Sequence, residues 1–219
     1  KISVIAQGAL KKTSKISSFT NLFNIVEYDL NKGRNFYYLK EGNLLESNSF
    51  LTKNIRTIAG GNLVAEMINK AIQDGSIESD IYDLTISFFI NLKNDPENVD
   101  LRIISYILKF ISFLGFQPDL TACIRCGRTR ANIYYPSLDE GGLICDECRV
   151  GLGKTQVNRN EFILLNNLIY SKSEDIGNIK VKDSVNVKKL LAVSLDFFKE
   201  AFEIDSLNSE KWLERLNFI

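Results

Sequence analysis

Two long parts of the chain carry apolar residues at intervals of three and four positions, which is the pattern of amphipathic α-helices. Residues 53–117 divide into three predicted helices, because Asp95 and Pro96 interrupt the pattern and Gly115 ends it. The pattern predicts further helices in residues 158–219. The last helix of the first part is apolar on most of its circumference, so we expect it at the centre of a bundle.

Local signals mark where some of these helices begin. Asn158 and Glu161 form a capping-box pattern, and Ser184 stands before the next apolar run. The pair Gly60 and Gly61 weakens the first helix by about 1 kcal/mol per glycine relative to alanine. We interpret the pair as a place where another helix approaches closely.

Residues 1–50 have the alternating pattern of short β-strands. We expect strands at residues 2–6, 22–30, 36–40 and 43–47. Asn31 to Arg34 are predicted to form the turn of a hairpin, because Asn and Gly tolerate positive φ. Short strands joined by tight turns suggest a small β-barrel.

All four cysteines of the chain lie between these helical parts, as two Cys-x-x-Cys pairs separated by eighteen residues. The pairs are Cys123 with Cys126, and Cys145 with Cys148. This spacing is typical of a zinc site, because two tight turns can aim four thiolates at one ion. Gly127 follows the first pair, where the turn needs positive φ.

The chain has no histidine, so a metal site built on these pairs has cysteine ligands only. Four protein ligands leave no open position for a reacting water, so we expect structural Zn²⁺. Two disulfides or buried free thiols are the alternatives. Disulfides are typical of oxidising compartments, and we find no secretory signal pattern and no apolar run long enough to span a bilayer. We therefore expect a cytoplasmic protein without a membrane partner.

The 219 residues include 27 basic and 27 acidic side chains, so the net charge is zero. A protein-wide basic footprint for nucleic acid is absent, and DNA binding would have to come from a local patch. The candidates are Lys11, Lys12 and Lys15 in a loop, with Lys32 and Arg34 on the predicted hairpin. Such lysines can hold phosphates, although a solvated surface loop has the same composition.

Three aromatic residues follow the predicted hairpin turn: Phe36, Tyr37 and Tyr38. Outward-facing rings can stack on bases. The simpler interpretation is that alternate rings pack inside the barrel.

An enzyme, for instance a nuclease that uses clustered carboxylates and Mg²⁺, is a rival from another class. The sequence has no grouped acidic pattern of that kind, no phosphate-binding loop and no histidine for general-base catalysis. A zinc-ribbon protein–protein adaptor without DNA contact is a further alternative.

Several stretches resemble the bacterial recombination mediator family RecO. The most specific runs from Gly115 to Leu120 and continues into the two cysteine pairs, with Gly141 and Gly142 just before the second. Residues 6–15 are similar to a basic loop in the family's oligonucleotide-binding (OB) barrel, and residues 206–213 are similar to its C-terminal stretch.

The resemblance implies a function and partners. Proteins of this family bind single- and double-stranded DNA and anneal complementary strands coated with single-stranded DNA-binding protein (SSB). They work with RecR, sometimes with RecF, to load RecA, and they do so without nucleotide hydrolysis. The resemblance therefore implies a nucleoid-associated protein of homologous recombination and DNA repair that also contacts the SSB C-terminal tail.

We predict an α+β protein made of four parts. Residues 1–50 form the OB-type barrel, 51–120 the first part of a helical domain, 121–152 the zinc-binding module and 153–219 the second helical part. An OB barrel has five strands and this chain opens directly into a strand, so we expect the first strand to lie upstream of Lys1.

Overall fold

The computed structural model describes residues 1–11, 14–151 and 153–217. The chain separates into two compact units, Lys1–Ser79 and Asp80–Ile219, and each is considered by itself. The mixed α+β class is confirmed. The predicted division into four parts stays a prediction.

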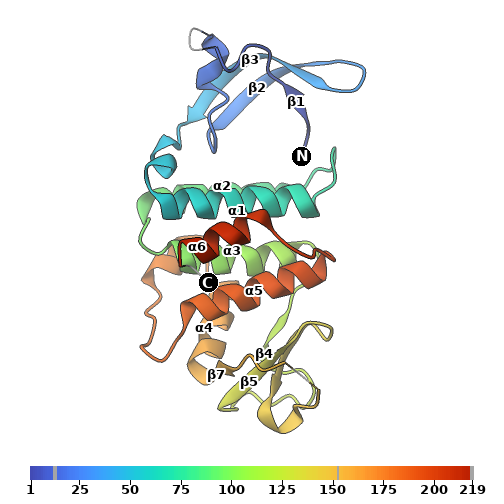
Figure 1. The fold of residues 1–219 in the computed structure, drawn as a ribbon, viewed down its shortest axis with the longest axis vertical. Helices are drawn as coiled ribbons and strands as arrows, with labels where there is room; N and C mark the ends of the chain where they lie inside the picture. Colours follow the sequence, from blue (N-terminus) through green and yellow to red (C-terminus); the bar gives the residue numbers. More distant parts are fainter. Residues whose placement is uncertain (12–13, 152, 218–219) are drawn as a thin grey trace. The chain divides into compact units, whose positions relative to one another are not determined.

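The first unit contains one curled sheet of three strands, β1 (Val4–Ile5), β2 (Ile25–Lys32) and β3 (Tyr37–Glu46), shown in Figure 1. The order is β1-β3-β2, with β1 parallel and β2 antiparallel to β3. The two strands expected at residues 36–40 and 43–47 are therefore one continuous strand. The five-stranded barrel stays a prediction, since the described residues of this unit form three strands.

The hairpin between β2 and β3 differs from the predicted turn. Asn31 and Lys32 belong to β2, so the loop starts at Gly33 and ends at Phe36. Gly33 is not among the residues with positive φ. Glycine is needed there for space, because a Cβ atom would lie 2.5 Å from Cε2 of Tyr38.

Helix α1 (Ile55–Ala71) completes this unit, and Asn54 caps it by accepting a hydrogen bond from the backbone N–H of Arg56 at 2.8 Å. At Gly61 the close neighbour is an aromatic ring, and the helix–helix approach expected at the glycine pair stays a prediction. A Cβ atom on Gly61 would lie 2.8 Å from Cζ of Phe23. Two 3-10 helices, η1 (Lys15–Ser18) and η2 (Ser49–Lys53), lie in the connections of this unit.

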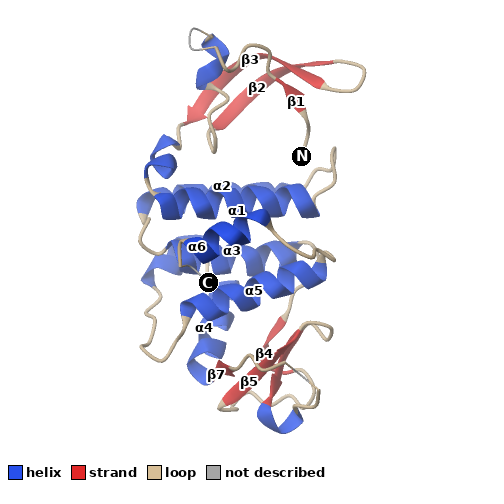
Figure 2. Cartoon of the chain, in the orientation of Figure 1, coloured by secondary structure: helices blue, strands red, loops and turns tan. Residues whose placement is uncertain are grey.

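In the residues that the structure describes, the second unit is built on five α-helices and a second sheet (Figure 2). The helices are α2 (Ser79–Asn94), α3 (Val99–Phe113), α4 (Arg159–Tyr170), α5 (Val187–Ala201) and α6 (Asn208–Arg215). Helix α3 is buried along most of its length and packs against α4 and α5, which confirms its predicted central place. The Phe110 ring lies 5.9 Å from the Phe198 ring of α5, in an edge-to-face arrangement.

An ion pair between the buried Arg102 and the half-buried Asp95 fixes the connection between α2 and α3. Asp95, which ends α2 as predicted, accepts a hydrogen bond from Nη2 of Arg102 at 2.8 Å. The other terminal nitrogen of Arg102 donates to the carbonyl of Ser173 in the 3-10 helix η4 (Ser173–Asn178). Gly177 of η4 leaves room for the pair, because a Cβ atom there would lie 2.3 Å from Oδ2 of Asp95.

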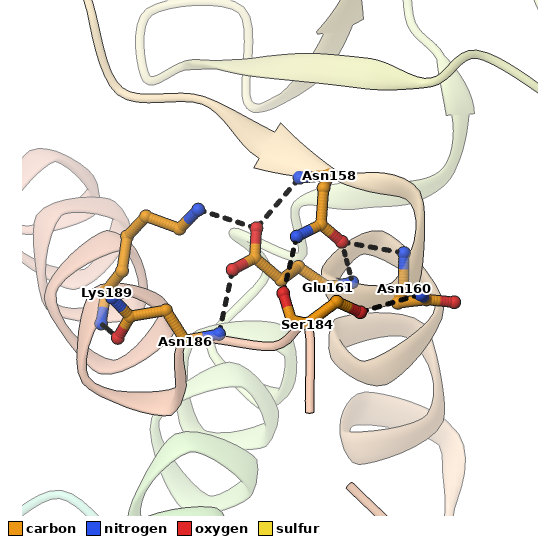
Figure 3. Close-up of polar contacts among 6 residues, drawn as sticks. All are labelled: Asn158, Asn160, Glu161, Ser184, Asn186 and Lys189. Atoms are coloured by element: carbon orange, nitrogen blue, oxygen red, sulfur yellow. Dashed lines mark hydrogen bonds and ion pairs between the residues drawn. The ribbon is translucent and has the colours of Figure 1, made fainter. Parts of the chain in front are cut away.

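One buried carboxylate joins the starts of α4 and α5 (Figure 3). The capping box at Asn158 is confirmed, and its partner Glu161 is only 1% exposed. Glu161 also accepts a hydrogen bond from the backbone N–H of Asn186 at 2.9 Å. It forms an ion pair with Lys189, with 2.6 Å between Oε2 and Nζ. Asn186 caps α5, which begins at Val187, shortly after Ser184 as expected.

The second sheet carries the cysteine pairs. Its strands are β4 (Asp119–Cys123), β5 (Ile133–Ser137), β6 (Gly142–Cys145) and β7 (Val157–Asn158), in the order β4-β6-β5-β7. Strand β7 runs directly into α4, and the Tyr134 ring of β5 stacks on the Phe162 ring of α4 at 4.2 Å. The sheet is therefore packed onto α4.

Candidate metal centre and nucleic-acid interface

The four cysteines meet at one point of the second sheet. Their sulfur atoms all lie within 4.8 Å of one another, and Sγ of Cys126 is 3.7 Å from Sγ of Cys145. Cys123 ends β4 and Cys145 ends β6, which are neighbouring strands. The second member of each pair follows in a tight turn: Cys126 is exposed and Cys148 is half-buried.

The backbone holds the first turn in the geometry that the spacing predicts. Gly127 has φ of 73°, and its N–H donates to the carbonyl of Cys123 at 2.8 Å. The N–H of Cys123 donates in turn to the carbonyl of Arg128 at 2.9 Å. The 3-10 turn η3 (Asp146–Cys148) shapes the second pair. Gly127 thus has the positive φ that was predicted for the residue after Cys126.

This arrangement fits a tetrahedral metal ion. With Zn–S bonds of about 2.3 Å, tetrahedral geometry places the sulfur atoms about 3.8 Å apart, close to the distance between Cys126 and Cys145. All four thiols are free in the structure, so it contains neither disulfide of the alternative interpretation. Four cysteines with no histidine in the chain form a donor set suited to Zn²⁺.

The electrostatics of the cluster point the same way. Burial acts to raise the pKa of Cys123, but hydrogen bonds from the backbone of Cys145, Cys126 and Arg125 outweigh it and lower the pKa to about 6. Hydrogen bonding with Cys126 and Cys145 raises the pKa of Cys148 to about 12. Thiols this close do not all ionise by themselves, whereas a divalent cation lets all four act as thiolates.

Two arginine–carboxylate pairs connect the first cysteine pair to the segment that holds the second. Arg125 donates to Glu140, with Nη2 at 2.6 Å from Oε1, and its Nη1 donates to the carbonyl of Cys148 at 2.8 Å. Arg128 makes two hydrogen bonds to Glu147. These hydrogen bonds raise the pKa of both arginines and lower the pKa of both carboxyl groups. We call these two pairs the arginine latches.

The latches explain why the module carries little free positive charge. The sequence of the module contains three arginines and four acidic residues whose charges nearly cancel: Arg125, Arg128, Arg130, Asp139, Glu140, Asp146 and Glu147. In the structure Arg125 and Arg128 each form an ion pair with a carboxylate, so their charges are neutralised by direct contact. The latches themselves were missed in the sequence, although one signal was present: Arg128 lies two residues after Cys126, and Glu147 lies between Cys145 and Cys148.

The cations predicted to hold DNA lie in the first unit. Lys11, Lys32 and Arg34 are exposed. Lys32 ends β2 and Arg34 lies in the β2–β3 loop, so these two share one hairpin. Lys12 is outside the described residues, and so is the side chain of Lys15. Their role in DNA binding stays a prediction.

The three aromatic residues of the hairpin have different surroundings. Phe36 is 47% exposed at the end of the loop, and Tyr37 is half-buried in β3. The Tyr38 ring packs over Gly33, although 38% of Tyr38 is exposed. Burial therefore alternates along the three residues, with the half-buried Tyr37 between two exposed rings, and base stacking by the exposed rings stays a prediction.

None of the helices in the described residues is long and apolar enough to cross a membrane.

Comparison with known sequences gives a consistent result. The profile of a family described as "Recombination protein O C terminal" matches residues 52–211. DNA repair protein RecO from Alkaliphilus metalliredigens is 26% identical over 204 residues, which cover 90% of this chain and 82% of that protein. DNA repair protein RecO from Listeria monocytogenes is 26% identical over 220 residues, covering 99% and 84%. The protein of the same name from Thermoanaerobacter is 29% identical over 156 residues, covering 68% and 60%.

Proposed function

The chain belongs to the RecO family of DNA repair and recombination proteins, and from this membership we propose that it is a recombination mediator. It binds single- and double-stranded DNA and anneals complementary strands coated with SSB. It also helps RecR to load RecA in the RecF pathway. The observation that carries the proposal is the family match over residues 52–211, together with relatives named DNA repair protein RecO that cover most of this chain.

The first unit supplies the DNA contacts in this proposal. Its curled sheet is the part of the chain that we assign to an OB-type barrel. Lys32 and Arg34 on the hairpin, with Lys11, Lys12 and Lys15 in the preceding loop, hold phosphates. Each phosphate contact releases condensed counterions, so binding tightens without reading sequence. Two DNA strands that lie on such a basic surface repel each other less, because the lysines and arginines screen their phosphate charges. This favours annealing.

The proposed mechanism requires no chemical step in the protein. The chain has no histidine and no phosphate-binding loop. The cysteine cluster has four ligands and no open position, so its Zn²⁺ contributes folding energy to the second unit and takes no part in a reaction.

We assign the contacts with SSB from the charge of its C-terminal tail. An SSB tail is acidic and ends in a carboxylate, so it would dock near exposed lysines. RecR contacts the protein directly, whereas RecA and RecF are reached through the assembly.

Neutralising the loop lysines tests the DNA contacts. We expect the variant Lys11→Gln/Lys12→Gln/Lys15→Gln to bind all DNA sequences more weakly and to about the same degree. The slope of log affinity against log salt should fall by roughly one unit per lost contact. Lys180→Gln, a change at an exposed lysine of the second unit, is the control. An unchanged slope in the triple variant would remove the lysines from the interface.

Replacing one thiol tests the role of the metal. Cys145→Ser is expected to bind less zinc and to unfold at a lower temperature, because structural zinc stabilises the fold directly. If the variant keeps its zinc and its melting temperature, the structural role is wrong.

A zinc-ribbon adaptor without DNA contact is the second candidate, and the neutralised arginines of the metal module favour it. It predicts binding to a protein partner and no salt-dependent binding to DNA.

A further inference from the structure

The β2–β3 hairpin carries an exposed aromatic ring between positive charges. Phe36 is 47% exposed, and Lys32 and Arg34 just before it are also exposed. Residues 30–40 include no Asp or Glu. Within the part of the chain that the structure describes, neither cation has an ion pair. The loop projects from the end of the sheet (Figure 1).

Two contacts hold the loop between β2 and β3 in place, and they therefore also fix the position of the Phe36 backbone. The N–H of Gly33 donates to the carbonyl of Phe36 at 2.9 Å, which closes the loop. The Tyr38 ring fills the space beneath Gly33 and leaves no room for a side chain there. A braced loop loses little conformational freedom when it binds a ligand.

We propose that Phe36 stacks on a base of single-stranded DNA while Lys32 and Arg34 hold the phosphates on either side of it. This proposal rests on the proposed DNA-binding function and adds to it a preference for single strands. An aromatic face accepts any unpaired base, whereas the bases of a duplex are already stacked on each other. Tyr38 supports the loop and is a positioning residue.

The first test compares two DNA probes, a single-stranded oligothymidine and a duplex of matched length. Phe36→Ala is expected to lower affinity for oligothymidine roughly 5- to 150-fold, the effect of losing one stacked base. Its duplex affinity and the salt slope should stay unchanged, because no phosphate contact is lost. Phe113→Ala removes a phenylalanine that is 53% exposed in the second unit and serves as the matched control.

The second test reads the contact directly by fluorescence. The chain has a single tryptophan, Trp212, in the second unit. In a Trp212→Phe background, Phe36→Trp places the only indole on the hairpin. Its emission should be quenched when oligothymidine stacks on it, and affinity should be kept.

The outcomes separate this inference from the function on which it rests. If the unchanged protein binds neither probe, both fail together. If it binds DNA in a salt-dependent way but Phe36→Ala binds equally well, only the stacking inference fails, and the exposed ring is assigned to a protein contact. Equal losses for both probes, full affinity in Phe36→Leu, or no quenching of Phe36→Trp would each overturn stacking.

Discussion

Arg128, two residues after Cys126, makes two hydrogen bonds to Glu147, which stands between Cys145 and Cys148. A side chain from one cysteine pair is thus held by a side chain from the other. Together with the link from Arg125 to Glu140 and the Cys148 carbonyl, this keeps the two halves of the metal site closed. Metal release requires the halves to separate, so the arginine latches should slow it.

Removing a latch should speed the loss of zinc to a chelator. For Arg128→Ala or Glu147→Gln we expect a rate roughly 1.5- to 5-fold higher and no more, because ion pairs exposed to solvent are weak. A coloured chelator mixed with the zinc-loaded protein gives the rate. The matched control is Arg130→Ala, since Arg130 is exposed and has no ion pair among the described residues. If Arg130→Ala releases zinc as fast as Arg128→Ala, the latches have no specific role.

The buried carboxylate of Glu161 should stabilise the second unit strongly. Glu161→Gln places an amide group among donors from the backbone of Asn158 and Asn186 and from Lys189. We expect the free energy of unfolding to fall by about 2–4 kcal/mol, since a charged hydrogen-bonding group is lost in a buried site. Urea unfolding measures it. Glu174→Gln, at an exposed carboxylate, should change little, and equal effects of the two changes would contradict the account.

Gly177 should resist enlargement although its backbone is not strained. A Cβ atom there would press on Asp95 and on Nη2 of Arg102, so Gly177→Ala is expected to cost about 1–3 kcal/mol of stability. Gly153→Ala is the control, because a Cβ atom at Gly153 has no neighbour within 4 Å. Thermal unfolding compares the two, and a neutral Gly177→Ala would show that the ion pair can move aside.

The pair between Asp95 and Arg102 should make stability depend on pH. Burial acts to raise the pKa of Asp95, but hydrogen bonds from Asn98 and Arg102 outweigh it and lower the pKa from its ordinary 3.8. A lowered carboxyl pKa stabilises the fold above the ordinary value, and this stabilisation is lost as the pH falls through the lowered value.

Asp95→Asn should therefore be less stable than the unchanged protein at about pH 7, and the difference should shrink towards about pH 2. Unfolding free energies of both proteins at the two pH values measure this. A constant difference across the range would assign the effect to packing.

The sequence predicted those features that depend on local chemistry. The cysteine spacing and Gly127 were sufficient to predict the cluster, and Asn158 with Glu161 was sufficient to predict the start of α4. The residues within each cysteine pair and within the capping box are only a few positions apart, so their spacing is visible in the sequence, and the neighbouring strands β4 and β6 then bring the two cysteine pairs together.

Features that depend on distant neighbours were missed or misplaced. Gly61 makes room for the ring of Phe23, which lies far away in the sequence, and no local pattern shows this contact. The cap of α5 at Asn186, whose backbone N–H donates to Glu161 twenty-five residues earlier, was not predicted. The single strand β3 was read as two because Gly42 interrupts its pattern, whereas that glycine makes room for the Phe19 ring.

The central claim is that this protein anneals DNA as a recombination mediator. The most direct measurement is the annealing of complementary strands coated with SSB, in the absence of a nucleotide, with the zinc-loaded protein. The account predicts faster annealing, which weakens when salt is raised or the loop lysines are neutralised. A folded, zinc-loaded protein that neither binds DNA nor speeds annealing would contradict the account and leave the adaptor as the better explanation.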